Sequence, residues 1–305
     1  MIALSIITPS YNRAAYLPRC YKSLQKQTSF DFEWIIVDDG STDDSSRVVS
    51  TFSSDQFPII YVKKANGGKH TALNAAHECI HGRYVLILDS DDFLTETAVQ
   101  EVSSAWEKYE KDPQVGIVTF LKGSDKGHPV CTVVDFDVPV EIMRYRRIRH
   151  TSSDCCEVIR AELFKKYPFP VFEGERFLAE SALWDRVSFT HKCVYINSVI
   201  YICEYLEGGL TKSGRSLRLR NPHGGMFTSE LRMDRSNFLK DRVKNGLLYN
   251  CYGKCAGIPF KDLIRQCRSP WLALLCAPAG QLLFHYWKRK NLYRCSRIEE
   301  RELDK

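Results

Sequence analysis

The chain lacks the patterns that mark several large classes of protein. It contains 12 cysteines among 305 residues, but they form no C-x-x-C pair and no matching histidine pair accompanies them. A zinc site needs such clustered ligands, so the cysteines are expected to be buried, reduced thiols of a cytosolic protein. The first residues have no charged region followed by an apolar core and a cleavage site, so we expect no signal peptide.

Two nucleotide-binding signatures are missing as well. G-x-G-x-x-G does not follow the first expected strand, and G-x-x-x-x-G-K-[ST] does not occur, which argues against the usual dinucleotide fold and a P-loop. Lysines and arginines cluster at 144–149, 212–220 and 288–290. Without a helix-turn-helix, zinc-finger or RNA-binding signature, these clusters suit phosphates or anionic lipid surfaces and do not indicate nucleic acid.

The remaining composition is that of an ordinary globular protein, with 44% hydrophobic and 26% charged residues and a net charge of +6. Strand patterns occur at 3–8, 34–37, 59–62, 84–88 and 115–121, and helix patterns at 16–27, 69–80 and 96–110. This alternation predicts an α/β fold with a parallel, doubly wound sheet. Further strands are expected at 131–136 and 194–203 and a helix at 180–189, and the sequence turns helical and basic from about 234.

The apolar strand expected at 84–88 ends in three carboxylates, Asp89, Asp91 and Asp92. Carboxylates at the carboxyl end of a buried parallel strand open into the crevice where α/β sheets bind ligands. If the extended geometry persists, Asp89 and Asp91 project to the same side, where they would favour Mg²⁺ or Mn²⁺ shared with a substrate phosphate. The alternative is a polar turn in which Asp92 caps the next helix.

Polar groups also follow the three earlier strands. Tyr11 could stack on a base, and Asp39 could accept a hydrogen bond from a pyrimidine N–H. Lys69 begins a helix after two glycines, which is a natural anion site. Each feature alone is equally an ordinary turn or helix entry, but together they indicate one ligand-binding crevice.

Four segments in order, Thr8–Asn12, Val37–Asp43, Asn66–Lys69 and Asp89–Asp92, resemble the motifs of family-2 glycosyltransferases. Those enzymes have the GT-A fold and use nucleotide-sugar donors; the resemblance is close over residues 1–125 and looser to about 225. It implies that Pro9, Tyr11 and Asp39 contact the nucleoside, usually uridine. It also implies a D-x-D site for metal and diphosphate at Asp89, Ser90 and Asp91, with Asn66 and Lys69 along the donor pocket.

The segment 177–186 is similar to the family's acidic motif, in which a carboxylate precedes a tryptophan and opens a helix. That motif commonly reads Glu-Asp, whereas this chain has Ala179 and Glu180. The resemblance implies that Glu180 is the catalytic base; the alternative is that it only caps its helix. The glycine-rich segment 207–215 suggests a loop that closes on diphosphate through Lys212 and Arg215. His223 could contact metal or phosphate, although a lone histidine in such a loop more often does neither.

The last apolar segment, 271–287, is too short and interrupted for a membrane span, which needs about 20 apolar residues. Its terminal aromatic residues, Trp271, Tyr286 and Trp287, and the basic cluster that follows are typical of an interfacial helix on an anionic leaflet. A helix packed on the domain or a dimer contact is an equal alternative. We therefore expect a GT-A domain at 1–225, with a nucleotide-binding half at 1–125 and an acceptor half with a lid loop at 126–225, and a helical extension at 226–305.

The predicted function is an inverting glycosyltransferase that uses Mn²⁺ or Mg²⁺ and transfers a sugar from a nucleotide-sugar to a glycan or lipid-linked acceptor. It would work in the cytoplasm, peripherally on the inner face of the plasma membrane; oligomerisation stays open. One alternative is a sugar nucleotidyltransferase, which would need a glycine-rich loop where this chain has residues 9–13, Pro-Ser-Tyr-Asn-Arg. The other is an inactive sugar-nucleotide-binding scaffold, which should have lost the D-x-D or the base.

Overall fold

The computed structural model describes residues 2–124, 128–133, 136–141, 154–203, 216–235 and 238–290. The chain divides into two compact units, residues 1–169 with 186–204 and residues 170–185 with 205–305. The division falls within helix α7 (Ser181–Ser188). Each unit has a hydrophobic core of its own. The expected functional division near residue 225 stays a prediction.

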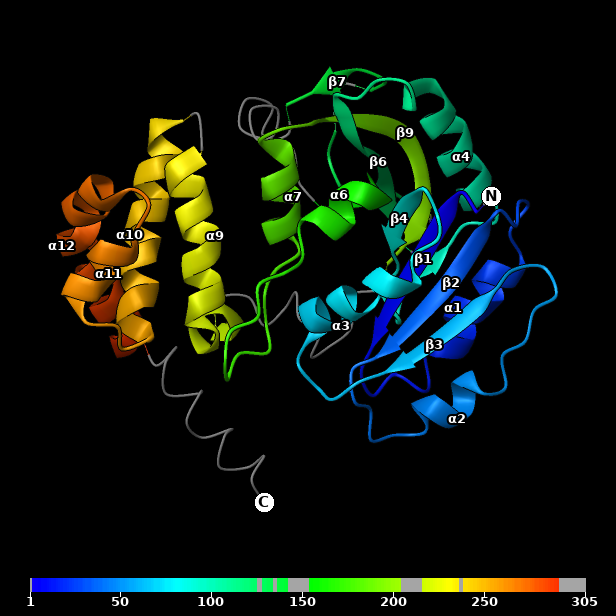
Figure 1. Cartoon of the computed structure of the whole chain (residues 1–305), viewed down its shortest axis with the longest axis horizontal. Coiled ribbons are helices and arrows are strands. Elements are labelled where there is room, and N and C mark those ends of the chain that lie inside the picture. Colours follow the sequence, from blue (N-terminus) through cyan, green and yellow to red (C-terminus); the bar gives the residue numbers. More distant parts are fainter. Residues whose placement is uncertain are drawn as a thin grey trace. The chain divides into compact units, whose positions relative to one another are not determined.

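The described strands of the first unit form one sheet (Figure 1). They are β1 (Leu4–Ser10), β2 (Phe32–Asp38), β3 (Ile59–Lys63), β4 (Tyr84–Ile87), β5 (Phe93–Leu94), β6 (Val115–Gly123), β7 (Pro139–Val140), β8 (Cys155–Arg160) and β9 (Lys192–Ile202). The strand order is β3-β2-β1-β4-β8-β6-β9-β5, and β7 pairs with β9. The predicted α/β fold class is therefore confirmed.

The first four strands of this order are parallel to one another, as the sequence predicts. Every residue of β1 and β2 is buried, as expected for strands that are covered on both faces. Pro9 lies within β1, where proline cannot donate to a neighbouring strand. It is tolerated because the pairing of β1 with β4 already ends at Ile7.

Helices cover both faces of the sheet. They are α1 (Leu17–Gln25), α2 (Ser45–Val49), α3 (Lys69–Ala75), the 3₁₀ turn η1 (His77–Cys79), α4 (Ala98–Tyr109) and α6 (Ala161–Lys166). Leu24 of α1 and Trp106 of α4 share a core with Trp34 of β2. Helix α3 contacts β1 and β2, helix α6 contacts β4 and β8, and Figure 1 shows α1 behind β2.

Strand β8 was not predicted. It runs antiparallel between β4 and β6, with Val158 opposite both Leu86 and Val118. The strand expected at 131–136 is wrong for its described residues, which are not in a strand. Beyond β8, β6 and β9 are parallel again, through a register with several irregularities.

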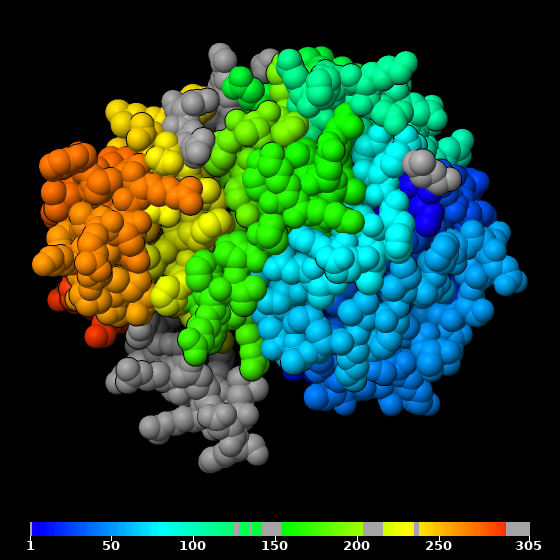
Figure 2. All heavy atoms as spheres, in the orientation of Figure 1, coloured from blue at the N-terminus to red at the C-terminus, as the bar shows by residue number. Residues whose placement is uncertain are grey.

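The described residues of the second unit include the helices α9 (Pro222–Arg235), α10 (Leu239–Cys255), α11 (Phe260–Gln266) and α12 (Pro270–Arg289), whose later members are drawn in orange and red in Figure 2. Two glycines let α10 and α12 approach closely. A Cβ added to Gly280 would lie 2.6 Å from the Cβ of Asn250, and one added to Gly246 would lie 2.8 Å from the Sγ of Cys276. In the described part of the chain, no helix combines the length and apolar character required to pass through a bilayer.

A buried carboxylate fastens the amino ends of three strands. Glu33 of β2 is 1% exposed and accepts a hydrogen bond from the Ser5 hydroxyl at 2.5 Å. It also accepts from the backbone N–H of His81 at 2.7 Å and of Gly82 at 3.2 Å, just before β4. The Gly82 N–H also donates to the Ser5 hydroxyl at 2.9 Å, so Glu33, Ser5 and the start of β4 form one buried hydrogen-bond network.

We predict that Glu33→Ala lowers the free energy of unfolding by about 3 kcal/mol, because the buried Ser5 hydroxyl and the His81 N–H lose their acceptor and a cavity is left in its place. Glu33→Gln keeps an acceptor oxygen and should cost less. Urea unfolding followed by circular dichroism measures both, with Glu107→Ala on the exposed side of α4 as the control. A loss for Glu33→Ala that matches the control would contradict the role assigned to this carboxylate.

Candidate active site

The loops that follow β1, β2, β3 and β4 are tied to one another at the carboxyl edge of the parallel strands. The backbone N–H of Asp39 donates to Ser10 at 2.8 Å, that of Lys64 donates to Asp38 at 3.0 Å, and that of Leu88 donates to Ile7 at 2.9 Å. The predicted residues Pro9, Tyr11, Asp39, Asn66, Lys69, Asp89, Ser90 and Asp91 all belong to these strand ends or loops.

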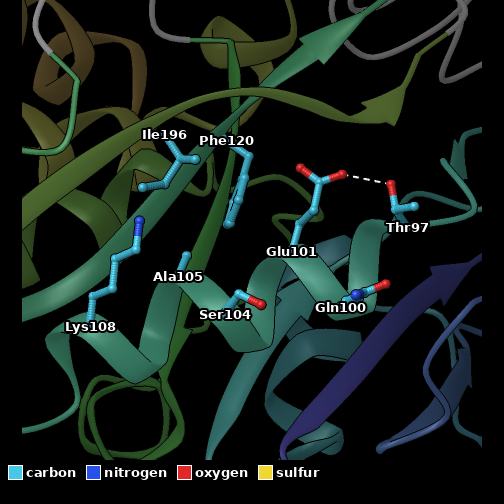
Figure 3. Close-up of a pocket in the computed structure, with 8 residues that line it drawn as sticks. All are labelled: Thr97, Gln100, Glu101, Ser104, Ala105, Lys108, Phe120 and Ile196. Carbon is cyan, nitrogen blue, oxygen red and sulfur yellow. Dashed lines mark hydrogen bonds between the residues drawn. The ribbon is translucent and has the colours of Figure 1, made fainter.

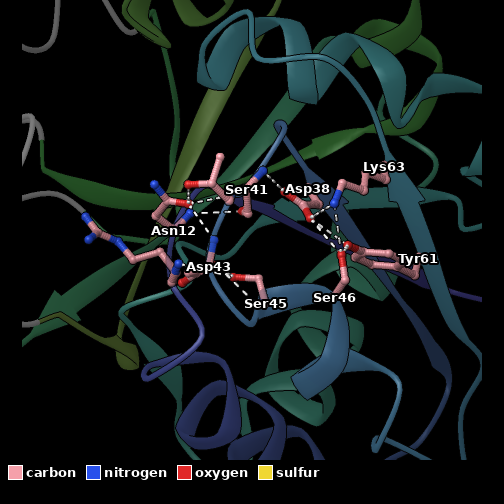
Figure 4. Close-up of polar contacts among 10 residues, drawn as sticks. Asn12, Asp38, Ser41, Asp43, Ser45, Ser46, Tyr61 and Lys63 are labelled. Carbon is pink, nitrogen blue, oxygen red and sulfur yellow. Dashed lines mark hydrogen bonds and ion pairs between the residues drawn. The ribbon is translucent and has the colours of Figure 1, made fainter. Parts of the chain in front are cut away.

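Asp38, the last residue of β2, stabilises the loops at this edge of the sheet (Figure 4). Its carboxylate accepts hydrogen bonds from the Ser41 N–H at 2.7 Å and from the Tyr61 hydroxyl at 2.6 Å. Burial opposes the charged form of Asp38, but these hydrogen bonds and the Lys63 ammonium outweigh it and lower its pKa. Asp38 is therefore held ionised by protein groups.

Asn12 joins the first loop to the second (Figure 4). Its backbone N–H donates to the Ser41 hydroxyl at 2.9 Å, and its side-chain oxygen accepts from the Thr42 N–H at 2.9 Å. Asn12 adopts a φ of 52°, in the left-handed region that asparagine tolerates better than most residues. The resulting turn presents Tyr11, whose side chain is 46% exposed and open to stacking on a base.

Asp39 is the most heavily hydrogen-bonded of the predicted residues. It is 3% exposed and accepts from Lys64 Nζ at 2.7 Å and from the N–H groups of Gly67 at 3.0 Å and Gly68 at 2.6 Å. The Thr71 hydroxyl is a fourth donor, at 3.5 Å, so protein groups already supply about as many donors as a carboxylate accepts. Contact with a base thus stays a prediction, but Asp39 also shapes the loop before α3.

The turn after Asp39 requires glycine. Gly40 has a φ of +80°, and a Cβ there would lie 2.7 Å from the backbone nitrogen of Asn66. The second and third loops are therefore in direct contact at Gly40. This contact places Asn66, which is half-buried, beside Asp39 in the same edge of the sheet.

Lys69 begins α3 and forms an ion pair with Asp89, which brings together two residues that the sequence assigned to different parts of the pocket. The expected extended geometry beyond β4 is wrong. Residues 89–92 form a turn in which the Asp92 N–H donates to the Asp89 carbonyl at 3.0 Å. Asp89 and Asp91 therefore share a turn, and their positions do not follow from strand alternation.

Two residues that the sequence did not single out hold this acidic turn. The Tyr201 hydroxyl, from β9, donates to Asp92 at 2.7 Å and accepts from the Asp89 N–H at 3.0 Å. Burial and the two carboxylates raise the pKa of Tyr201 well above its usual range, so the phenol stays protonated. Lys122 lies over the Tyr201 ring, with its Nζ 4.4 Å from the ring centroid. Asp92 thus binds Tyr201 and does not cap α4.

Arginines from the first loop and from α1 also reach the acidic turn. The Arg19 guanidinium donates to the Asp91 carbonyl, and Arg13 Nη2 lies 3.9 Å from the Asp91 carboxylate. Burial opposes ionisation of Asp89, but the cations of Lys69, Lys122 and Arg13 outweigh it and lower its pKa. The turn therefore presents the ionised carboxylate of Asp89 within a positively charged surround, which suits a diphosphate.

The donor set of this turn fits a small divalent cation. Among the residues that the structure describes, no three or more histidine, cysteine or acidic side chains converge on one point. Mg²⁺, however, is commonly bound by one or two carboxylates and completed by water and substrate phosphates. Asp89, with about a third of its side chain exposed, and Asp91, with about a fifth, would supply the acceptor oxygens for that arrangement, and the metal site stays a prediction.

Glu180 lies in the second unit, directly before α7, where its carbonyl accepts the N–H of Leu183 at 2.8 Å. Its role as the base stays a prediction. Lys212 and Arg215 lie outside the described residues.

His223 is bound by Glu175, whose carboxylate accepts hydrogen bonds from the His223 ring Nδ1 at 2.8 Å and from the His223 backbone N–H at 2.7 Å. These contacts give His223 a structural role at the start of α9.

A separate pocket of about 370 Å³ lies between α4 and the strands β6 and β9 (Figure 3). Phe120 and Ile196 line it together with polar groups of α4, among them Glu101, which accepts the Thr97 hydroxyl at 2.6 Å. None of the predicted site residues lines this pocket. The candidate site is thus the carboxyl edge of the parallel strands.

Known proteins share both the sequence and the fold. Glycosyltransferase GlyG of Streptococcus pneumoniae serotype 4 is 26% identical over 223 residues, which cover 69% of this chain and 73% of GlyG. The structure of S. aureus TarS 1-349 in complex with UDP-GlcNAc has a TM-score of 0.63 at 17% identity, covering 95% of this chain and 92% of that one.

A mannosyltransferase from Pyrobaculum calidifontis, PcManGT, in complex with GDP-Man and Mn²⁺, has a TM-score of 0.56 at 18% identity, covering 99% of this chain and 87% of that one. These likenesses show the GT-A type of fold that the sequence resemblance implied. The family model of glycosyl transferase family 2 matches residues 5–167, which contain all four ordered motifs. The chain therefore belongs to glycosyl transferase family 2.

Proposed function

We propose that this enzyme transfers a sugar, with inversion, from a UDP-sugar to an acceptor hydroxyl in the synthesis of a polysaccharide or lipid-linked glycan. The observation that carries the proposal is the ion-paired acidic turn at Asp89–Asp92, at the edge where Tyr11 and Asp39 also lie. UDP is supported by the TarS complex with UDP-GlcNAc, a neighbour in fold. The sugar itself is left open.

In this proposal the first unit binds the donor. Tyr11 stacks on the base, and Asp39 accepts its N–H. Asp89 and Asp91 would hold Mn²⁺ or Mg²⁺, which would supply positive charge to the diphosphate leaving group. The PcManGT complex with Mn²⁺ supports this cofactor. Lys69, now paired with Asp89, can turn to a phosphate oxygen once the diphosphate arrives, and Lys212 and Arg215 would add charge from the loop 207–215.

Glu180 is proposed to take the proton of the acceptor hydroxyl. The hydroxyl oxygen then forms a bond to the anomeric carbon from the face opposite the nucleotide, while the bond to the diphosphate breaks. The proton stays on Glu180, and the electron pair leaves with the nucleotide. We place this reaction in the cytoplasm, at the inner face of the plasma membrane, with the residues 271–290 as the membrane contact.

Release of nucleotide from UDP-, GDP- and dTDP-sugars in the presence of Mn²⁺ tests the function directly. Turnover of at least one donor is expected, with UDP-sugars preferred. Tight UDP binding without hydrolysis or transfer of any donor would instead support the inactive scaffold.

We predict that Tyr11→Ala weakens UDP binding about tenfold, because base–aromatic stacking contributes about 1–3 kcal/mol. Tyr11→Phe keeps the ring and should bind as the unchanged protein does. Isothermal titration with UDP measures both, and the exposure of Tyr11 makes a folding defect unexpected. Equal losses in the two variants would assign the contact to the hydroxyl and contradict stacking.

Asp91→Asn is predicted to abolish the gain in UDP affinity that Mn²⁺ provides, because an amide is a poor substitute for a carboxylate ligand. The measurement is a UDP titration with and without Mn²⁺. Asp55→Asn, at an exposed position in the loop before β3, is the matched control. An unchanged Mn²⁺ dependence in Asp91→Asn would remove this carboxylate from the metal site.

Glu180→Gln is predicted to lower the rate of donor turnover by about 10²- to 10⁴-fold with little change in the KM for the donor, as loss of a general base does. Glu173→Gln, exposed in the same unit, serves as the control. Turnover within threefold of the unchanged enzyme would show that Glu180 only supports its helix.

A further inference from the structure

Helix α12 is apolar on two opposite faces. One face is buried in the second unit and consists of Ala273, Cys276, Ala277, Gly280, Phe284 and Trp287. The other carries a set of large exposed side chains, here called the exposed stripe: Trp271, Leu274, Leu275, Leu282 and Tyr286. Trp271 is 82%, Leu275 77% and Leu282 71% exposed. A helix at a protein surface normally turns polar residues outward, so this face is unusual.

The exposed stripe is continuous along the helix. Its members follow helical spacing, since Leu275 comes four residues after Trp271 and Tyr286 four residues after Leu282. Pro278 and Ala279, which lie between them, are also exposed and uncharged. A helix of 20 residues is about 30 Å long, so the stripe offers an extended apolar edge.

Positive charge borders both ends of the exposed stripe. From Lys254 to Lys290 the sequence holds seven basic residues and one acidic residue, and α12 itself contains no carboxylate. Arg268 precedes the helix with a side chain that is 56% exposed and lies 3.9 Å from the Glu230 carboxylate, and Lys288, Arg289 and Lys290 end the helix and are exposed. The apolar edge thus has cations where a flat-lying helix would meet lipid headgroups.

The structure separates the three aromatic residues that the sequence predicted at the membrane interface into exposed and buried ones. Trp271 and Tyr286 belong to the exposed stripe, and Lys290 Nζ lies 5.1 Å from the Tyr286 ring centroid. Trp287, expected at the interface, is 5% exposed, with its ring centroid 6.2 Å from that of Tyr252, so that expectation is wrong. Packing on the protein and contact with a membrane are therefore compatible for this helix, because one face is packed and the opposite face is exposed.

We propose that the exposed stripe binds the surface of a bilayer that contains anionic phospholipids, with α12 lying in the plane of the headgroups. The apolar side chains enter the acyl boundary, and the cations contact lipid phosphates. A second copy of the chain is a poorer occupant, because it would bring the same cations against each other. Membrane contact would bring the enzyme to a lipid-linked acceptor, a benefit that rests on the proposed function. The contact itself depends only on the side chains of α12 and the cations beside it.

The test is flotation of the full chain with vesicles of phosphatidylglycerol and phosphatidylcholine, against vesicles of phosphatidylcholine alone. Binding is expected to the anionic vesicles and to weaken with salt. Tryptophan emission gives a second signal, because Trp271 is exposed whereas the other four tryptophans, Trp34, Trp106, Trp184 and Trp287, are buried. A blue shift on binding therefore reports Trp271, and Trp271→Phe should abolish it.

The double substitution Leu275→Ser and Leu282→Ser should weaken vesicle binding about tenfold or more, because it removes two side chains from the apolar contact. Leu239→Ser on α10 is the matched control, since that leucine is 71% exposed but lies outside the exposed stripe. Lys288→Gln and Arg289→Gln should each weaken binding to anionic vesicles about fivefold.

Three outcomes would overturn the proposal: no flotation of the full chain, no blue shift, or equal losses in the stripe variant and the Leu239→Ser control. Light scattering in the absence of vesicles adds a fourth: a dimer that the stripe variant converts to a monomer would assign the surface to a second copy. Donor hydrolysis without vesicles should be unchanged in the stripe variant, so a failure of vesicle binding and a failure of the proposed enzyme activity are separable.

Discussion

The buried carboxylate of Asp39 is the interaction on which the arrangement of the candidate site depends. Asp39 directly follows β2, and its hydrogen bonds with Lys64 and the N–H groups of Gly67 and Gly68 set the loop that leads into α3. Because α3 begins at the next residue, the same contacts place Lys69 opposite Asp89. Asp39 therefore connects the end of the second strand to the acidic turn after the fourth, and removing its charge would loosen both.

The sequence predicted the parts of this site that follow from local pattern. Parallel strands carry their following loops to one edge, so locating β1 to β4 was enough to place the residues after each of them together. The pairing of Lys69 with Asp89 is an example: neither residue indicates the other in sequence, but both follow strands of the same parallel set. Rules based on local sequence patterns were sufficient here because successive parallel strands are joined by the same kind of strand–helix–strand connection.

What the sequence could not predict depends on contacts between distant segments. Tyr201 binds Asp92 across 109 residues of sequence, and nothing in the pattern of β9 distinguishes it from an ordinary core tyrosine. Strand β8 is short and contains Glu157 and Arg160 among its apolar residues, and its place between β4 and β6 is decided by pairing with distant segments. The geometry of the acidic turn was misjudged for a related reason, since strand alternation was extended past Ile87, where the strand already ends.

The packing of α12 is the opposite of the usual rule for a surface helix. Its buried face is built mainly from small residues, among them Ala273 and Gly280, which let α10 approach closely. Leu272 and Leu283 pack partly against that core, whereas Leu274, Leu275 and Leu282 are exposed. Apolar surface left in water forgoes about 25 cal/mol for each Å² that could be buried. Packing within the second unit therefore does not explain why these exposed side chains are apolar, whereas contact with an apolar phase outside the chain does.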